Sequence, residues 1–518
     1  MRRTLSTLAL LAAAGCGSYH TFYANDALWD PDVAVTTDGT YVRLPHAQQL
    51  IRLQENGTYV QLDLDGATPT RLVTTPDQER LLVFSQWPEC KDDDEDIELV
   101  SDCPSDALVY HNELSVVDDT TVTPLGEIAP HMNALAFSED GAIAVAYLDY
   151  ENGDDIQIDG IADLGEVRFI RLSDGTEGRV SVGFSPERIL FSQDGETAVI
   201  MSRSVVVAVD LETFEKVLEA PLRLDADDQV DPSGAALTPD GGTLLVTVVG
   251  SSDLYMLELG DEGAYWNLAS LGAEPATLAV DAVTNRSVFV FAGAAEVDVL
   301  DNDGLDAFSQ GLIEQITLDE PATDILMGAG FAVLYNNRNI NTRDVYQLKL
   351  DSMELVEHVM DNPVRSMQLT DSGRYGVAVL QPEDSYTNDL DGFQDARWGL
   401  GVIDLASEDT ISLVTESKPV GVALVEDDTS SYALVLLEGQ GYLLYVDLAN
   451  PSVPTLVDLP APASALSTLP DGRFLISHTA ALGLVSYLDP QTLEMNSVDG
   501  FAVAGLLRED VLPRRGEQ

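Results

Sequence analysis

One repeated unit constrains this chain more than any other feature of its sequence. The stretch Ala235–Gly260 alternates apolar, β-branched runs with two clusters of turn residues, Pro239–Gly242 and Gly250–Asp253. Proline fixes φ and glycine permits positive φ, so each cluster ends one strand and lets an antiparallel strand follow. About ten related units succeed one another, each roughly 40 to 50 residues long with about four strands. The sequence therefore predicts an all-β chain that forms a β-propeller of four-stranded blades.

A turn after the first apolar strand aligns the units with one another. It most often reads Asp-Gly, and an apolar run of strand length follows it directly. In chain order the turns are Asp38-Gly39, Pro76-Asp77, Asp140-Gly141, Asp194-Gly195, Asp240-Gly241, Asp281-Ala282, Gly328-Ala329-Gly330, Ser372-Gly373, Asp427-Asp428 and Asp471-Gly472.

The number of units leaves their arrangement open. Because propellers usually have about four to eight blades, ten units indicate one unusually large ring, two rings in tandem, or partial blades at the chain ends. We favour one ring, with the count of ten slightly high. A ring must also be closed, and we expect Val33–Thr36 and Phe501–Leu507 to pair as strands across the junction.

Three of the units carry a resemblance to a known family. Leu237–Leu259, Ile189–Leu211 and Leu469–Leu488 resemble the repeats of YVTN-type and lactonase-like bacterial β-propellers. The Val-x-Val-x-Asp strand of such repeats is matched by Val206–Asp210, Leu444–Asp447 and Val485–Asp489. The resemblance implies a blade and leaves the activity open. Its lactonase-like members suggest one alternative function, a hydrolase with a metal in the central channel.

The N-terminus has the pattern of an export signal. Arg2 and Arg3 precede the short apolar run Leu5–Ala14, and the small residues Ala13–Gly15 lead to Cys16. The last four residues resemble a bacterial lipobox, which implies that Cys16 is lipidated. Gly17 after the cysteine then implies an outer-membrane lipoprotein of the cell envelope that faces the periplasm or the cell surface. We expect a signal peptide at 1–15, a tether at 16–30, the propeller at 31–507 and a tail at 508–518.

Two further cysteines fit an oxidising compartment. If Cys16 takes lipid, Cys90 and Cys103 remain as a pair close in sequence. A disulfide between them would close a short loop and contribute about 3 kcal/mol. Two free thiols are the alternative.

The charge balance limits the partners of this chain. With 88 acidic and 26 basic residues, its formal net charge is -62. Such a field repels nucleic acid and anionic lipid headgroups, so we expect no nucleic-acid partner and membrane contact through the lipid anchor only. Cations or basic partners are favoured, although the charge also fits a surface that is merely kept soluble. No basic patch stands out in the sequence.

Three units are longer than the others, directly after the strong apolar run. The inserts are Trp87–Ala107, Asp149–Gly165 and Gln381–Trp398, and all three are acidic. Equivalent loops of a propeller emerge on the same face, so we expect the inserts to crowd one rim. Loops on a rigid scaffold often carry function.

Two inserts contain oxygen ligands at calcium-loop spacing. Asp155, Gln157, Asp159, Asp163 and Glu166 occupy positions one, three, five, nine and twelve of a loop with glycine at position six. The third insert repeats part of this pattern in Asp389, Asp391 and Asp395. Calcium is the predicted cofactor of these loops, and a solvated acidic loop is the alternative.

Signs of catalysis are few. The six histidines have no metal-ligand spacing, and the chain has no Gly-x-Ser-x-Gly elbow, P-loop or dinucleotide-binding glycine pattern. We therefore favour a lipid-anchored binding or scaffold module whose ligand is a protein, peptide or glycan. The hydrolase remains the alternative.

Overall fold

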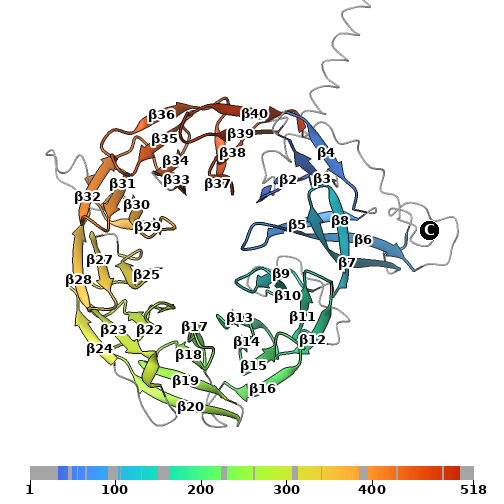
Figure 1. Ribbon diagram of the computed structural model, residues 1–518, viewed down its shortest axis with the longest axis horizontal. Helices are drawn as coiled ribbons and strands as arrows, with labels where there is room; N and C mark the ends of the chain where they lie inside the picture. The colour runs from blue at the N-terminus through green and yellow to red at the C-terminus, as the bar shows by residue number, and fades with distance from the viewer. Residues whose placement is uncertain are drawn as a thin grey trace, which may run out of the picture.

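Ten four-stranded antiparallel sheets form one closed ring (Figure 1). The computed structural model describes residues 33–44, 49–54, 57–64, 67–91, 103–105, 107–129, 131–149, 163–222, 230–260, 263–305, 313–339, 341–383, 395–427, 430–480 and 483–501. Each sheet is one blade made of four consecutive strands, with its first strand nearest the ring axis and its fourth at the outer rim (Figure 1). The predicted all-β propeller in a single ring is confirmed.

The strands follow the chain in order. Blades 1 to 5 comprise β1 (Val33–Thr36), β2 (Gly39–Leu44), β3 (Gln49–Leu53), β4 (Tyr59–Leu62); β5 (Thr68–Thr74), β6 (Leu81–Cys90), β7 (Leu108–Asp118), β8 (Thr121–Ile128); β9 (Ala134–Phe137), β10 (Ile143–Tyr147), β11 (Glu166–Arg171), β12 (Glu177–Ser181); β13 (Pro186–Phe191), β14 (Thr197–Ser202), β15 (Val205–Asp210), β16 (Lys216–Pro221); and β17 (Pro232–Leu237), β18 (Thr243–Val248), β19 (Asp253–Gly260), β20 (Gly263–Ser270).

Blades 6 to 10 comprise β21 (Thr277–Asp281), β22 (Arg286–Val290), β23 (Glu296–Asp301), β24 (Ile313–Thr317); β25 (Asp324–Gly328), β26 (Phe331–Tyr335), β27 (Asp344–Lys349), β28 (Glu354–Val359); β29 (Val364–Leu369), β30 (Tyr375–Leu380), β31 (Gly399–Asp404), β32 (Asp409–Val414); β33 (Pro419–Glu426), β34 (Ser431–Leu437), β35 (Tyr442–Asp447), β36 (Thr455–Asp458); and β37 (Ala463–Thr468), β38 (Phe474–His478), β39 (Leu484–Leu488), β40 (Met495–Asp499). A single 3₁₀ turn, Asn302–Gly304, follows β23 among the described residues.

The predicted turns all lie between the first and second strands of their blades. Hydrogen bonds within the turn explain why its sequence recurs. The Thr238 hydroxyl donates to Asp240 Oδ1 at 2.7 Å and accepts from the Thr243 N–H at 2.9 Å. Ser138 and Ser192 make the same pair of bonds in blades 3 and 4. Each side chain thus satisfies backbone groups where the sheet ladder stops.

Hydrophobic packing between blades holds the ring together. The buried apolar residues form ten clusters, and each cluster combines side chains of two neighbouring blades. The second strands contribute to two clusters at once, because successive side chains point to opposite faces of a sheet. Leu81 and Val83 of β6 pack toward blade 1, whereas Leu82 and Phe84 pack toward blade 3. A strand buried on both faces needs a continuous apolar run, as these sequences have.

The ring closes by packing, and among the described residues Val33–Thr36 does not make the predicted strand pairing across the junction. This segment is β1, the first strand of blade 1, and it pairs with β2 of the same blade. The tenth hydrophobic cluster joins blade 1 to blade 10 and includes Ile51, Leu475 and Phe501. Residues 502–507 lie outside the described part of the chain. Since both end blades have four strands of their own, no strand exchange is required.

The expectation that ten units overstates the blade number is also wrong. Every unit builds a complete four-stranded sheet, and the first and last blades are as complete as the others. Each of the ten interfaces is filled by a hydrophobic cluster, so the larger ring leaves no interface between blades unpacked.

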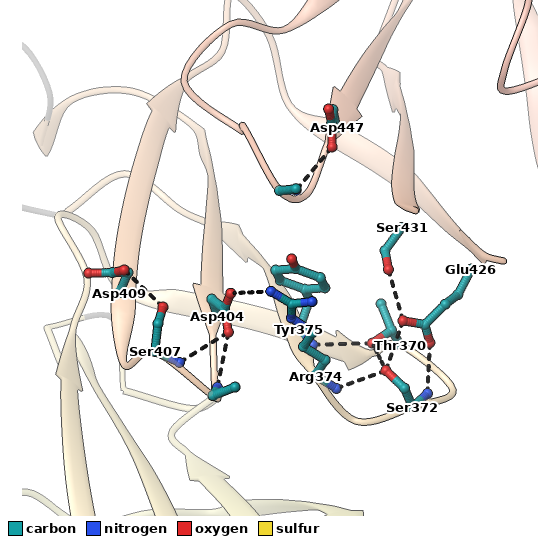
Figure 2. A network of polar contacts seen from close by, with 12 residues as sticks. Thr370, Ser372, Arg374, Tyr375, Asp404, Ser407, Asp409, Glu426, Ser431 and Asp447 are labelled. Atoms are coloured by element: carbon teal, nitrogen blue, oxygen red, sulfur yellow. Dashed lines mark hydrogen bonds and ion pairs between the residues drawn. The ribbon is translucent and has the colours of Figure 1, made fainter. Parts of the chain in front are cut away.

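Polar contacts reinforce the packing at the interface of blades 8 and 9 (Figure 2). Glu426, the last residue of β33, accepts hydrogen bonds from the Ser372 N–H and the Ser372 hydroxyl, each at 2.8 Å. The Ser431 hydroxyl donates to the same carboxylate at 2.8 Å. Partial burial opposes ionisation, but these donors outweigh it and lower the pKa of Glu426. The carboxylate therefore links the turn of one blade to the adjacent blade.

The two faces of the ring carry different loops. The turns between first and second strands define one face, called here the turn face. The loops between second and third strands, and the connections between blades, lie at the opposite ends of the strands and define the insert face. Among the described residues no helix has the length and apolarity needed to cross a membrane.

Candidate functional site

The three inserts occupy the same position in their blades. They lie between β6 and β7 of blade 2, between β10 and β11 of blade 3, and between β30 and β31 of blade 8. Their described ends therefore lie on the insert face, as predicted. These ends do not all lie together, because blades 2 and 3 are neighbours whereas blade 8 lies across the ring (Figure 1).

The first insert is stabilised by a long hairpin. Trp87–Cys90 belongs to β6, where the sequence suggests a loop, and Cys90 pairs with Leu108 across the ladder. Cys90 and Cys103 form a disulfide, which confirms the predicted pairing. The His111 ring stacks on Trp87 with 4.1 Å between centroids, and its Nε2 lies 2.8 Å from Glu89 Oε2. The hairpin extends outward from the ring beyond its neighbours (Figure 1).

The second insert has two of its predicted calcium ligands in the described part of the chain. Asp163 accepts a hydrogen bond from the Gly165 N–H at 2.9 Å. Glu166 begins β11, with Oε1 3.9 Å from Arg179 Nη1. Both carboxylates interact electrostatically with His131, which is buried with 1% of its surface exposed. Burial lowers the pKa of His131, and the two carboxylates partly counteract this shift. The remaining predicted ligands, Asp155, Gln157 and Asp159, lie outside the described residues.

The third insert ends in an ion-paired carboxylate. Asp395 Oδ1 lies 2.9 Å from Arg343 Nη2, and the Arg343 Nε donates to Glu383 Oε1 at 2.6 Å. The Glu383 N–H donates to the Asp395 carbonyl oxygen at 2.8 Å. These contacts tie both ends of the insert to blade 7. Asp389 and Asp391 lie outside the described residues, as does Cys16.

A cationic pocket lies close to the ring axis between blades 8 and 9. It has a volume of about 310 Å³ and includes Arg365 and Lys418, which come from different blades. The sequence shows no basic patch here, because these two cations are far apart along the chain. Lys418 directly precedes β33, and Arg365 is the second residue of β29. Both therefore lie toward the insert face.

A larger cavity of about 460 Å³ lies at the junction of blades 1 and 10, on the turn face. The two arginines that line it already have partners. Arg473 pairs with Asp471, and Arg52 Nη1 lies 2.7 Å from Asp119 Oδ1. A charged ligand would therefore gain less from the arginines of this cavity than from the cations of the cationic pocket.

Metal-binding groups of the usual kind are absent from the described ranges. No cluster of three or more His, Cys, Asp or Glu side chains is placed there to hold an ion. His478 shows the structural use of a buried histidine: its Nδ1–H donates to the Ala461 carbonyl at 2.8 Å, and its Nε2 accepts from the Ser486 hydroxyl at 2.8 Å. The hydrolase alternative gains no candidate ligands and stays a prediction.

Comparisons with known proteins assign no family to this chain. The chain matches no protein-family model and no curated protein sequence. Among solved structures it is similar to hydrazine synthase of Kuenenia stuttgartiensis, with 16% identity over 61% of this chain and 95% of that chain and a TM-score of 0.35. The dihydro-heme d1 dehydrogenase NirN has 16% identity over 65% and 72% of the two chains and a TM-score of 0.38. A eukaryotic initiation factor has 11% identity over 75% and 93%, with a TM-score of 0.47. These similarities extend to the fold and carry no function to this chain.

Proposed function

We propose that this chain is a lipid-anchored, extracytoplasmic β-propeller that binds a protein, peptide or glycan through its insert face. One observation carries the proposal: three long acidic inserts emerge from equivalent positions on a rigid ring. A scaffold that fixes its loops in this way suits recognition, since the loops can vary while the blades stay packed. The net charge of -62 favours a partner with basic groups and disfavours nucleic acid.

Binding can be tested with matched variants of the two faces. In one variant a two-residue Asn-Gly turn replaces residues 150–162 between β10 and β11. In the control, two glycines lengthen the Asp194-Gly195 turn on the opposite face. Peptide and glycan arrays should give ligands that bind the wild type and the control but not the shortened protein. Ligands that bind all three proteins equally would refute a role for the second insert in binding.

Anchoring rests on the resemblance of residues 13–16 to a lipobox. A cell grown with labelled palmitate should incorporate the label into the wild-type chain but not into Cys16→Ser. Cys90→Ser is the matched control, because it removes a cysteine elsewhere and should keep the label. Label that persists in Cys16→Ser would remove the anchor from the proposal.

Calcium is proposed as a stabilising ion of the second and third inserts. The support is the ligand spacing, together with the electrostatic interaction of both Asp163 and Glu166 with His131. A ligand that binds only the native state must raise the melting temperature. Millimolar calcium should therefore raise Tm, a chelator should reverse the shift, and Asp159→Asn should reduce it. An equal response in Asp159→Asn and the wild type would contradict this site.

A further inference from the structure

The pocket between blades 8 and 9 has a charge opposite to that of the chain as a whole. Arg365 and Lys418 line it, and none of its other lining residues is acidic: Ser366, Gln368, Val379, Pro419, Val420, Gly421 and Val422. The chain as a whole has 88 acidic and only 26 basic residues. Two cations at one site without an acidic side chain between them are therefore a local exception.

Neither cation is neutralised by the described part of the protein. Most arginines there have a carboxylate or carbonyl partner, as Arg343 has in Asp395 and Arg374 has in Asp404. Arg365 and Lys418 have no side-chain ion pair or hydrogen bond among the described residues; their recorded side-chain contact is with the Trp398 ring. Like charges placed side by side repel, so an anion between them would relieve this repulsion.

The Trp398 ring holds both cations at the pocket. The Arg365 guanidinium carbon lies 6.0 Å from the ring centroid and the Lys418 ammonium lies 5.5 Å from it. The negative face of an indole attracts cations at this range. Trp398 directly precedes β31, so the chain end of the third insert supplies the ring. Two flexible side chains are thereby oriented before any ligand arrives, which lowers the entropy cost of binding.

The other side of the pocket is apolar. Val379 is 7% exposed and forms part of its floor, whereas Val420 is 50% exposed and offers an open surface. The innermost strands explain the space. β33 and β37 approach closely, but β29 and β33 are farther apart. The hydroxyl of Ser366 and the amide of Gln368 add hydrogen-bonding groups along β29.

We propose that this pocket binds a small organic anion, a carboxylate on a compact apolar body. The carboxylate would lie between Arg365 and Lys418, and the apolar body would contact Val420 and Pro419. A charge-assisted hydrogen bond from a guanidinium is among the stronger ones in proteins, and a volume of about 310 Å³ fits a ligand of this class. The inserts contribute only Trp398 to this site and the blades supply its lining residues, so the site does not depend on the function proposed above.

Calorimetry on the full chain tests this assignment with benzoate, its neutral analogue benzamide, and inorganic phosphate. Benzoate should bind at least about tenfold more tightly than benzamide, and Arg365→Gln and Lys418→Gln should each weaken benzoate about tenfold. Lys349→Gln is the control, because it removes a cation that pairs with Glu354 on blade 7, outside this pocket. Added salt should weaken benzoate binding and leave benzamide unchanged.

Trp398→Leu tests the positioning role of the ring. It should lower the preference for benzoate over benzamide while the melting temperature stays close to that of the wild type. The assignment fails if benzoate does not bind, if benzamide binds equally well, or if both glutamine variants bind like Lys349→Gln. Phosphate that binds as tightly as benzoate would overturn the apolar part of the assignment. None of these results depends on whether shortening the second insert abolishes partner binding.

Discussion

Replacing Phe501 by alanine should weaken the ring at one interface. Phe501 is 2% exposed, follows the last described strand, and belongs to the cluster that joins blade 1 to blade 10. Its ring lies over Gly483, where an added Cβ would come within 2.5 Å of the ring. Removing a fully buried phenylalanine costs about 3 to 5 kcal/mol through lost transfer energy and the remaining cavity. This is a large part of the usual stability of a folded domain.

The place where the structure opens should distinguish a weakened junction of blades 1 and 10 from a weakened interface elsewhere in the ring. Blades contact mainly their neighbours, so a weakened junction should open before the blades themselves unfold. Hydrogen exchange of Phe501→Ala, measured by mass spectrometry, should therefore rise first in β1–β4 and β37–β40. Phe289→Ala is the matched control, because Phe289 is equally buried but packs between blades 5 and 6. Urea unfolding should give similar losses for the two variants. Identical exchange maps would refute closure by packing at the junction.

Three further changes probe other parts of the molecule. Cys90→Ser with Cys103→Ser should lower the free energy of unfolding by about 3 kcal/mol, and reductant should destabilise the wild type but not the double variant. Lowering the pH from about 7.5 to 5.5 should destabilise the protein. Burial lowers the pKa of His131, His358 and His478 in the folded chain. The unfolded chain, whose histidines have a pKa of about 6.5, therefore takes up protons first as the pH falls, and the stability present above that pKa is lost. This slope should be smaller in His478→Gln; an unchanged slope would contradict a neutral His478 in the fold. Glu426→Ala should weaken the contact between blades 8 and 9 by about 1 to 3 kcal/mol, seen as faster exchange of the Ser372 turn, whereas Glu438→Ala should have little effect.

The blades could be predicted from the sequence because their determinants are local. Asp240 and Thr238 form their turn within a few residues, and the apolar run of β18 that follows it is buried on both faces. Related turns and apolar runs recur along the chain, and the predicted turns fall where the first strand of a blade meets the second. The disulfide followed from the even pair of cysteines that remained after Cys16.

The closure and the cationic pocket could not be predicted because they depend on distant residues. Ile51 and Phe501 come from opposite ends of the chain, and nothing near Val33 distinguishes a first strand from a closing strand. Arg365 and Lys418 come together only because blades 8 and 9 are neighbours. Local patterns also leave out contacts between distant residues: Asp395 matches a calcium ligand in spacing, and only the fold shows that its carboxylate pairs with Arg343.

The central claim is that one closed ring of ten blades carries all three inserts on one face. Cryo-electron microscopy of the intact chain, with an antibody fragment bound to each insert in turn, tests it most directly. The account predicts a single ring of ten blades in which blade 1 contacts blade 10, with all three fragments on the same side. Two smaller rings, an open arc, or fragments on opposite sides would contradict it.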